Sequence, residues 1–492
     1  MACDNMAGVF VATAAAVVKP KPVRFAAGER QLDPLWRAGY SLAAFQMRNM
    51  SSHHRNNPRP LRSSMHRPLP LPLAFCLGLA SLGQTTLAGD WPQWRGPNRD
   101  GHATDPGHTL VALPKEPKVL WRLDVGLGHS APVIVGNKLI YLDELEGKEV
   151  AHALDLATRK ELWRQTYDNQ AVEYSGFGQG PRCAPLVEGD RVYVQSGRGE
   201  FHCLSLADGK SIWKVDFEKD FGATWFGNKS SNPDAKETAS RRHGNNGSPV
   251  IDGNRIFVPV GDPKGATLVC FDKMNGKKLW QVGEDNTAYS SLMAGTLGGV
   301  RQAVHYTADA LLGADAATGK LLWRIPIKTG AKRHTVTPIL TGDTVLVSSH
   351  SVGMIKMKIV KDGGTVKAEQ DWLNAGVKTM LSTPVLVGDY LYGLGTTKGK
   401  NSDFVCIDFK TGKELWNQPG AFADYASLIT LGDKILALNS TGELSLLKAN
   451  PQHFEELGRV QVCGKTWSFP AYVDGKLYVR DERQIRAVEL VK

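Results

Sequence analysis

A set of polar and aromatic side chains stands just before the β-rich runs that are spread through the chain. Its members are His129, Arg182, His243, Asn246, Tyr289, His334, Met380, Tyr425 and Trp467. An Arg guanidinium is a rigid fork of donors that suits carboxylates, and a Trp ring offers a flat face for stacking. A fold that gathers these residues would make a binding site for a protein or a small ligand. The alternative is that they only cap a water-filled channel.

Motifs for the common catalytic and metal-binding chemistries are absent from the sequence. Ten histidines follow residue 88, but no HExxH pair, GxSxG turn, CxxC or CxxCH motif occurs. No acidic cluster has the spacing of a calcium-binding loop. The sequence therefore predicts no catalytic residue and no metal site, and it favours binding over catalysis.

One phrase returns five times and indicates the elements that would position the polar set. It has the form Asp-x-x-x-Gly-Lys-x-x-Trp, with Arg159 replacing Gly in one copy and Ser205 replacing Asp in another. The Trp falls eight residues after the Asp or Ser each time, at Trp163, Trp213, Trp280, Trp323 and Trp416. A looser copy ends at Trp372. Because apolar residues around the phrase recur every second position, each copy predicts β-strands rather than a helix.

Two-residue turns made of Gly, Asp and Asn give an independent count of these units. Eight occur, starting at residues 136, 189, 252, 298, 342, 388, 432 and 474, and they are 42–63 residues apart. Such dipeptides supply the positive φ that tight hairpins need. Four strands in a period of this length are typical of a propeller blade. The predicted fold is an all-β, eight-bladed β-propeller of four-stranded antiparallel blades over residues 117–492.

The two ends of this region complement each other. The last hairpin, residues 471–481, is followed by one more strand over 485–490, so the eighth blade lacks a Trp-bearing fourth strand. A strand with a Trp occurs at the other end, over residues 119–123, and contains Trp121. We therefore expect the N-terminal strand to pair into the last blade and close the ring, which removes two exposed strand edges.

The charge distribution argues against nucleic acid as a partner. The net charge is +10, but residues 1–88 hold ten Lys and Arg and only three acidic residues, which leaves 49 basic and 46 acidic residues in the remainder. No basic patch with interleaved aromatic residues is present there. Five cysteines follow residue 88, and Cys203, Cys270 and Cys406 occupy one equivalent repeat position. That pattern predicts packed thiols rather than disulfides.

The N-terminal 88 residues resemble an export signal behind a leader. Residues 65–88 show a basic start, an apolar stretch and the small residues that precede a cleavage site after Ala88. The apolar stretch is too short for a membrane span, so we expect no transmembrane segment in the mature chain. Residues 1–64 have no strand or helix rhythm and are interpreted as a non-native or disordered leader. Residues 89–116 form an N-terminal segment, and the mature bacterial protein is expected in the periplasm or outside the cell.

The repeated phrase resembles the pyrroloquinoline-quinone-like (PQQ-like) propeller repeat, which occurs in quinoprotein alcohol dehydrogenases and in the outer-membrane assembly factor BamB. The opening residues 90–97, DWPQWRGP, are similar to the mature start of a group of exported repeat proteins. The resemblance covers about residues 90–490. It implies that the repeat Trp residues, including Trp121, are structural and that the five in full or near-full copies pack between neighbouring blades.

The resemblance implies a BamB-like binding or scaffolding module, with a quinone-dependent oxidoreductase as the alternative. Quinoprotein dehydrogenases use the quinone PQQ, a calcium or lanthanide ion, a catalytic Asp and usually a disulfide between adjacent cysteines. This chain has no adjacent cysteines, and no Asp aligns with the catalytic one. We therefore expect no cofactor, PQQ being the alternative, and a protein or small-molecule ligand at one face of the propeller.

Overall fold

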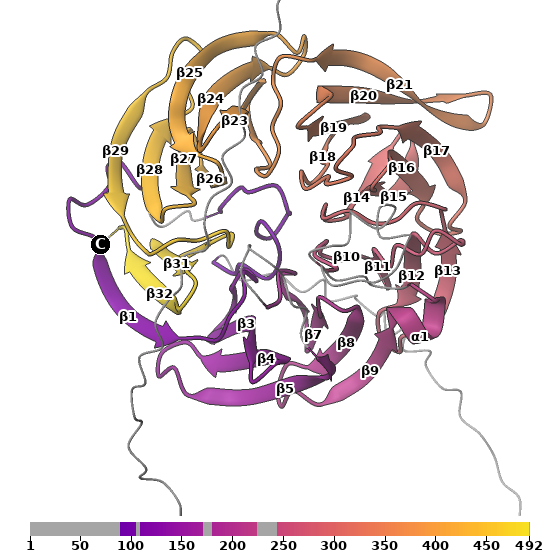
Figure 1. Ribbon diagram of the computed structural model, residues 1–492, viewed down its shortest axis with the longest axis horizontal. Helices are drawn as coiled ribbons and strands as arrows, with labels where there is room; N and C mark the ends of the chain where they lie inside the picture. Colours follow the sequence, from indigo (N-terminus) through magenta and orange to yellow (C-terminus); the bar gives the residue numbers. More distant parts are fainter. Residues whose placement is uncertain (1–88, 105–108, 171–179, 224–243, 492) are drawn as a thin grey trace, which may run out of the picture. The chain divides into compact units, whose positions relative to one another are not determined.

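The computed structural model describes residues 89–104, 109–170, 180–223 and 244–491. The predictions for 1–64, for the signal over 65–88 and for His243 fall outside these ranges. Within them the chain forms eight four-stranded antiparallel sheets and one short helix, α1 (Phe217–Phe221). The sheets follow one another around a ring (Figure 1), which confirms the predicted eight-bladed β-propeller.

Each blade is a meander whose first strand lies nearest the centre of the ring (Figure 1). Blade 1 contains β2 (Val133–Val135), β3 (Lys138–Leu145), β4 (Lys148–Asp155) and β5 (Glu161–Gln170). Blade 2 contains β6 (Leu186–Glu188), β7 (Arg191–Gln195), β8 (Glu200–Ser205) and β9 (Ser211–Asp216). Blade 3 contains β10 (Val250–Asp252), β11 (Arg255–Val258), β12 (Leu268–Asp272) and β13 (Lys278–Val282). Blade 4 contains β14 (Met293–Leu297), β15 (Val300–Tyr306), β16 (Ala310–Asp315) and β17 (Leu321–Pro326).

The second half of the ring repeats the arrangement. Blade 5 contains β18 (Ile339–Thr341), β19 (Thr344–Ser349), β20 (Gly353–Asp362) and β21 (Thr365–Asn374). Blade 6 contains β22 (Val385–Val387), β23 (Tyr390–Lys398), β24 (Asn401–Asp408) and β25 (Glu414–Ala423). Blade 7 contains β26 (Ala426–Leu431), β27 (Lys434–Asn439), β28 (Glu443–Lys448) and β29 (Glu456–Gln461). Blade 8 contains β30 (Ala471–Val473), β31 (Lys476–Arg480), β32 (Gln484–Glu489) and the N-terminal β1 (Lys118–Asp124).

Ring closure is as predicted from the two ends of the sequence. Strand β1 pairs antiparallel with β32, from Lys118 opposite Glu489 to Asp124 opposite Gln484. A fully buried arginine, Arg480 at the end of β31, reinforces the junction between blades 8 and 1. Its guanidinium donates to three main-chain carbonyls next to or within blade 1, those of Gly126 (3.2 Å), Ser130 (3.3 Å) and Leu142.

The repeated Asp-x-x-x-Gly turn is stabilised by hydrogen bonds from main-chain N–H groups to the Asp carboxylate. In blade 3 the Asp272 carboxylate accepts from the main-chain N–H of Met274 (2.8 Å) and Asn275 (3.3 Å). In the equivalent turn of blade 4, Gly319 has a φ of +76°, and a Cβ there would lie 2.6 Å from the ring of Trp280. Glycine thus satisfies both the turn and the close approach of the neighbouring blade.

Most of the repeat Trp residues dock onto the turn of the next blade, as the resemblance implies. The indole N–H donates to a main-chain carbonyl there, in the pairs Trp163–Leu206, Trp213–Lys273, Trp280–Ala316, Trp372–Phe409 and Trp416–Asn450. These bonds are 2.9–3.3 Å long. In the first four pairs the carbonyl belongs to the recurring Asp-x-x-x-Gly turn or its Ser205 variant, whereas Trp416 docks onto a turn of different sequence in blade 7.

Two of the predicted structural Trp residues have different surroundings. The indole N–H of Trp323 donates to Gln302 Oε1 of its own blade at 2.7 Å, and the following blade 5 lacks the Asp-x-x-x-Gly turn. Trp121 on β1 is half-buried and lies 6.0 Å from the ring of Tyr478, also in its own blade. Arg159 occupies the Gly position of the turn in blade 1, with a positive φ of 59°.

The N-terminal segment crosses the central channel of the ring, which the sequence did not predict (Figure 1, indigo). Trp91 pairs with Ile134 of β2 through two main-chain hydrogen bonds of 2.8 and 3.0 Å. The carbonyl of Pro92 accepts from the N–H of Val187 on β6 at 2.9 Å. Further along, Gly101 accepts from Thr430 of β26 at 2.8 Å. We call residues 90–103 the plug.

Side chains of the plug reach the remaining blades. Arg99 donates to the carbonyls of Ser248 (3.2 Å) and Leu292 (3.0 Å), just before β10 and β14. Arg95 donates to the carbonyl of Pro384 before β22 at 3.1 Å. Trp94 donates to Thr337 Oγ1 before β18 and packs its ring 5.2 Å from that of Phe469 before β30. The plug therefore contacts all eight blades.

Candidate functional site

A cavity of about 250 Å³ lies at the mouth of the channel, above the plug. We call it the mouth cavity. Seven of the nine residues in the predicted set line it, namely His129, Arg182, Asn246, Tyr289, Met380, Tyr425 and Trp467. The remaining lining residues are Trp94, Ser291, Arg333, Thr335, Leu381, Ser382, Thr383, Ala426 and Phe469. The sequence-predicted set is thus largely brought together.

One rule of position accounts for the contribution of each blade. Six blades have a Pro just before or at the start of the inner strand, and the lining residue stands three positions before it; Leu292 and Leu428 take the place of Pro in the other two. Applied to all blades, the rule gives His129, Arg182, Asn246, Tyr289, Thr335, Leu381, Tyr425 and Trp467, and all eight line the cavity. Side chains next to them, such as those of Ser130, Cys183 and Ser468, are buried.

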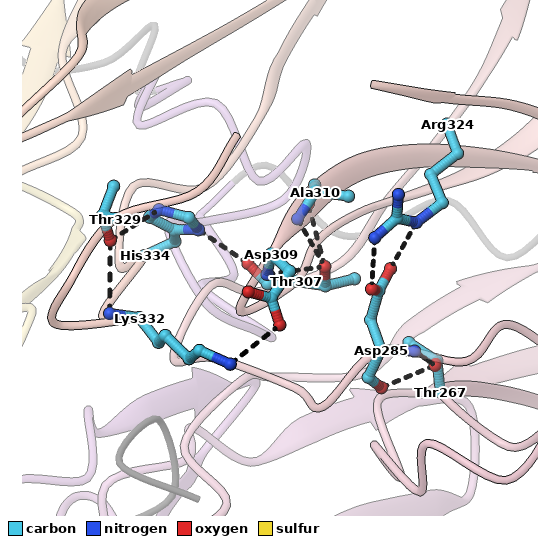
Figure 2. Close-up of polar contacts among 9 residues, drawn as sticks. All are labelled: Thr267, Asp285, Thr307, Asp309, Ala310, Arg324, Thr329, Lys332 and His334. Atoms are coloured by element: carbon cyan, nitrogen blue, oxygen red, sulfur yellow. Dashed lines mark hydrogen bonds and ion pairs between the residues drawn. The ribbon is translucent and has the colours of Figure 1, made fainter. Parts of the chain in front are cut away.

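The structure corrects the prediction for His334. This side chain is 1% exposed and does not line the mouth cavity, whereas its neighbours Arg333 and Thr335 do. Its Nδ1 lies 2.7 Å from the carbonyl of Thr307, and its ring stacks on Tyr306 at 4.0 Å. Figure 2 shows His334 in this network of polar contacts. The error is one residue of register, which in an extended segment turns a side chain to the opposite face.

Burial fixes the charge state of two groups near the mouth. Desolvation lowers the pKa of His334 to about 4, so this ring is neutral at physiological pH. Desolvation also raises the pKa of Tyr425 to about 12, and its hydroxyl hydrogen bonds to Ser427 Oγ at 2.6 Å. The permanently charged side chains among the lining residues are Arg182 and Arg333.

Sequence reasoning missed several lining residues. Trp94 and Phe469 form part of the wall, and Trp94 comes from the plug. Arg333 was overlooked because His334 beside it was taken as the lining residue. Counting three positions back from Pro338 identifies Thr335 and would have corrected the register of this segment.

The wall combines positive charge with aromatic rings. Arg182 and Arg333 line the mouth cavity, and no Asp or Glu is among its lining residues. The ring of Trp467 lies 5.8 Å from that of His129, and Lys465 Nζ lies 5.7 Å from the centre of the Trp467 ring. Such a site is suited to an anion with a flat apolar part.

Replacing Arg182 or Trp467 with Ala should change the free energy of unfolding by only about 1 kcal/mol or less. Both side chains are half-buried and line the mouth cavity, whereas an inter-blade Trp such as Trp280 is buried. Denaturant unfolding monitored by circular dichroism measures the change. A loss as large as that of an inter-blade Trp would place these residues in the core and remove them from the site.

Glu149 on β4 is a buried carboxyl outside the mouth cavity. One carboxylate oxygen accepts from the N–H of Gly197 at 2.8 Å, and the other has no hydrogen-bond partner among the described residues. Burial raises the pKa of Glu149 to about 8, and the negative charges of Glu144 and Glu200 act in the same direction. The folded protein therefore holds a proton here that the unfolded chain loses near pH 4.5.

The Glu149→Gln variant should lose less stability than the wild type as the pH rises from 5 to 8. In that window only the unfolded state of the wild type ionises Glu149, so its stability falls with pH and stops falling above about pH 8. The amide cannot ionise but keeps an oxygen to accept from Gly197. We expect a difference of about 3 kcal/mol across the window, measured by urea unfolding at several pH values. Parallel pH profiles for the two proteins would contradict the assignment.

Among the described residues, no group of three or more His, Cys, Asp or Glu side chains is arranged to hold a metal ion. None of the helices in the described ranges has the length and apolarity that crossing a membrane requires.

Comparisons with known proteins agree with the fold. BamB of Burkholderia pseudomallei (strain K96243), named as an outer membrane protein assembly factor, is 25% identical over 309 residues, which are 60% of this chain and 70% of that protein. The crystal structure of BamB from Moraxella catarrhalis matches with a TM-score of 0.49 and 14% identity over 75% of this chain and 98% of that one. The computationally designed Ika8 protein matches with a TM-score of 0.50 and 11% identity over 78% and 100%, a likeness of fold alone.

The family evidence comes from the repeat region itself. The sequence profile of the family described as outer membrane protein assembly factor BamB matches residues 146–418, more than half of the chain. This match begins in blade 1 and ends in blade 6, so it includes the junctions at which Trp163, Trp213, Trp280 and Trp372 dock onto the next blade. The chain belongs to the BamB family of outer membrane protein assembly factors.

Proposed function

We propose that this protein is a non-catalytic binding module of outer membrane protein assembly that takes its ligand in the mouth cavity. The observation that carries the proposal is the contrast between two sets of equivalent positions. The docking Trp and the Gly of the turn meet at four junctions, which share one packing arrangement, in the pairs Trp163–Gly209, Trp213–Gly276, Trp280–Gly319 and Trp372–Gly412. The eight mouth positions are occupied by seven different residue types, and only Tyr occurs twice.

That contrast has a physical meaning. Eight blades built alike would present eight like side chains at the mouth if these only closed a channel. A mixture of cationic, aromatic, amide and aliphatic side chains makes the wall different on each side, as a binding site for an asymmetric ligand requires. The plug supports the same interpretation, because Trp94 gives the cavity a floor and holds the wall in place.

The size of the mouth cavity bears on the alternative of a quinone-dependent oxidoreductase. A volume of about 250 Å³ is below the range of about 300–1,000 Å³ that is usual for sites of drug-sized ligands. We propose that PQQ, a three-ring quinone with several carboxylates, is too large for this cavity and is not the ligand. A dye-linked dehydrogenase assay with added quinone and calcium should give no turnover. Robust turnover would overturn the proposal.

A photo-crosslinking amino acid placed at position 381 tests whether the mouth engages a ligand in the cell. Leu381 lines the mouth cavity, whereas Leu279 is 45% exposed on the outer strand of blade 3 and serves as the matched control position. We expect adducts from position 381 that are absent from position 279 and that disappear when Trp467 is replaced by Ala. Equal adducts from both positions, or none from 381, would contradict binding at the mouth.

We further propose that the protein acts outside the cytoplasm, after cleavage behind Ala88. The three-part pattern over residues 65–88 supports export. N-terminal sequencing of protein recovered from the cell envelope should begin at Gly89. Uncleaved protein found only in the cytosol would defeat this part of the proposal.

A further inference from the structure

We propose that the ligand of the mouth cavity is a hydroxylated, single-ring aromatic carboxylate. The inference rests on the proposed function and specifies the chemistry of the ligand at the same site. It follows from four properties of the wall: its charge, its buried hydrogen-bonding atoms, its aromatic faces and its volume.

The charge of the wall calls for an anion. Arg182 comes from the segment before blade 2 and Arg333 from the segment before blade 5, and no carboxylate is among the lining residues. Arg333 forms no ion pair within the described ranges, and its buried Nε has no hydrogen-bond partner there. A carboxylate is the group that best stabilises a guanidinium without an ion-pair partner, because it accepts charge-assisted hydrogen bonds from it.

A second buried atom calls for a hydrogen-bond donor on the same ligand. The side-chain oxygen of Asn246, from the segment before blade 3, is buried in the cavity wall and lacks a partner among the described residues. A buried acceptor without a donor is costly, and a carboxylate cannot supply one. A hydroxyl group on the ligand would satisfy this atom while the carboxylate faces Arg333.

The aromatic rings of the wall and the volume of the cavity indicate the shape of the ligand. Tyr289, Trp467, Phe469 and the floor residue Trp94 present aromatic surface to the cavity. Trp94 is held by its hydrogen bond to Thr337, so the floor is rigid. Flat rings stack well on such surfaces, and the volume of about 250 Å³ accommodates one ring with its substituents rather than a fused system. For a ligand of this size we expect a Kd on the order of 0.1 mM.

The test uses isothermal titration of the protein with four probes. The probes 4-hydroxybenzoate and the longer 4-hydroxyphenylacetate carry both groups, benzoate lacks the donor, and 4-hydroxybenzamide lacks the charge. We expect at least one of the first two to bind. The benzamide should bind about tenfold or more weakly, because its carbonyl accepts from the guanidinium without the negative charge of a carboxylate. Benzoate should bind several-fold more weakly than 4-hydroxybenzoate.

Variants assign the two groups to the two side chains. Arg333→Gln should lower the affinity for 4-hydroxybenzoate about tenfold or more. This variant should then bind 4-hydroxybenzoate no more tightly than the benzamide. In the Asn246→Ala variant, 4-hydroxybenzoate should no longer bind more tightly than benzoate, but it should still bind more tightly than the benzamide. Arg122→Gln is the matched control, because Arg122 is exposed on β1 outside the cavity, and its titrations should equal those of the wild type.

The outcomes separate this inference from the proposed function. If none of the probes binds at millimolar concentration while position 381 still crosslinks, the ligand class is wrong and the mouth still binds. If the probes bind but Arg333→Gln has no effect, the inferred anion contact is wrong. If neither probes nor crosslinks report on the mouth, both proposals fail.

Discussion

Replacing Arg480 with Met should lower the free energy of unfolding by about 3–5 kcal/mol. Three carbonyls at the closure of the ring, those of Gly126, Ser130 and Leu142, accept from this guanidinium, and the side chain is 0% exposed. Met fills a similar volume, so the loss reports the carbonyls left without a donor rather than a cavity. Denaturant unfolding with circular dichroism gives the change.

Arg122→Met is the control for this experiment. Arg122 lies on β1 at the same closure of the ring but is exposed, so its replacement should change stability by no more than about 0.5 kcal/mol. Equal stability of the Arg480 variant and this control would show that the buried arginine does not hold the first and last blades together.

The Trp280→Ala variant should be destabilised by about 3–5 kcal/mol, as expected for truncation of a buried aromatic side chain. Trp280 is 9% exposed, lies 5.5 Å from the ring of Phe257 and donates to the carbonyl of Ala316 in the next blade. The change removes the contact with Gly319 as well. The measurement is again the free energy of unfolding.

The neighbouring residue provides the comparison for Trp280. Leu279 precedes it on β13 and points the other way along the same strand, with 45% exposure. Leu279→Ala should therefore cost well under 1 kcal/mol. If the two variants unfold alike, the repeat Trp does not hold adjacent blades together.

The blades could be predicted because their packing repeats. Four junctions pack a Trp against a Gly with positive φ, so Trp280 and Gly319, like their equivalents, recur in the sequence within a repeated phrase. Where one partner is missing the structure departs from the pattern. Trp323 has no such turn to dock on and bonds instead within its own blade.

The mouth cavity could be predicted in outline but not in register. An inner strand of only three residues, such as β18, gives too short a pattern to fix which of two adjacent residues faces the channel. His334 and Thr335 are both polar and adjacent, and burial rather than residue type distinguishes them. The predicted cationic and aromatic character of the cavity wall is still correct, because Arg333 in the same segment lines the cavity.

The plug could not be predicted from sequence patterns. Its buried arginines, Arg95 and Arg99, are surrounded by main-chain carbonyls rather than by carboxylates. Desolvation lowers the pKa of Arg99 to about 9. Main-chain carbonyls belong to every residue, so no complementary charge elsewhere in the sequence points to these partners. Arginines in a segment rich in Gly, Pro and Asn predict a solvated loop unless the channel around them is known.

The closure of the ring has a consequence for how the protein folds. Lys118 on β1 pairs with Glu489, 371 residues later in the chain. The plug, which is synthesised just before β1, cannot make all of its contacts until all eight blades have formed. Contacts of such high order form late and slowly, because the entropy of closing the loop must be overcome before they contribute. Until then β1 and β32 are open strand edges that can pair with another chain. Synthesis therefore yields a chain whose first strand must remain unpaired and protected until its last strand has been made.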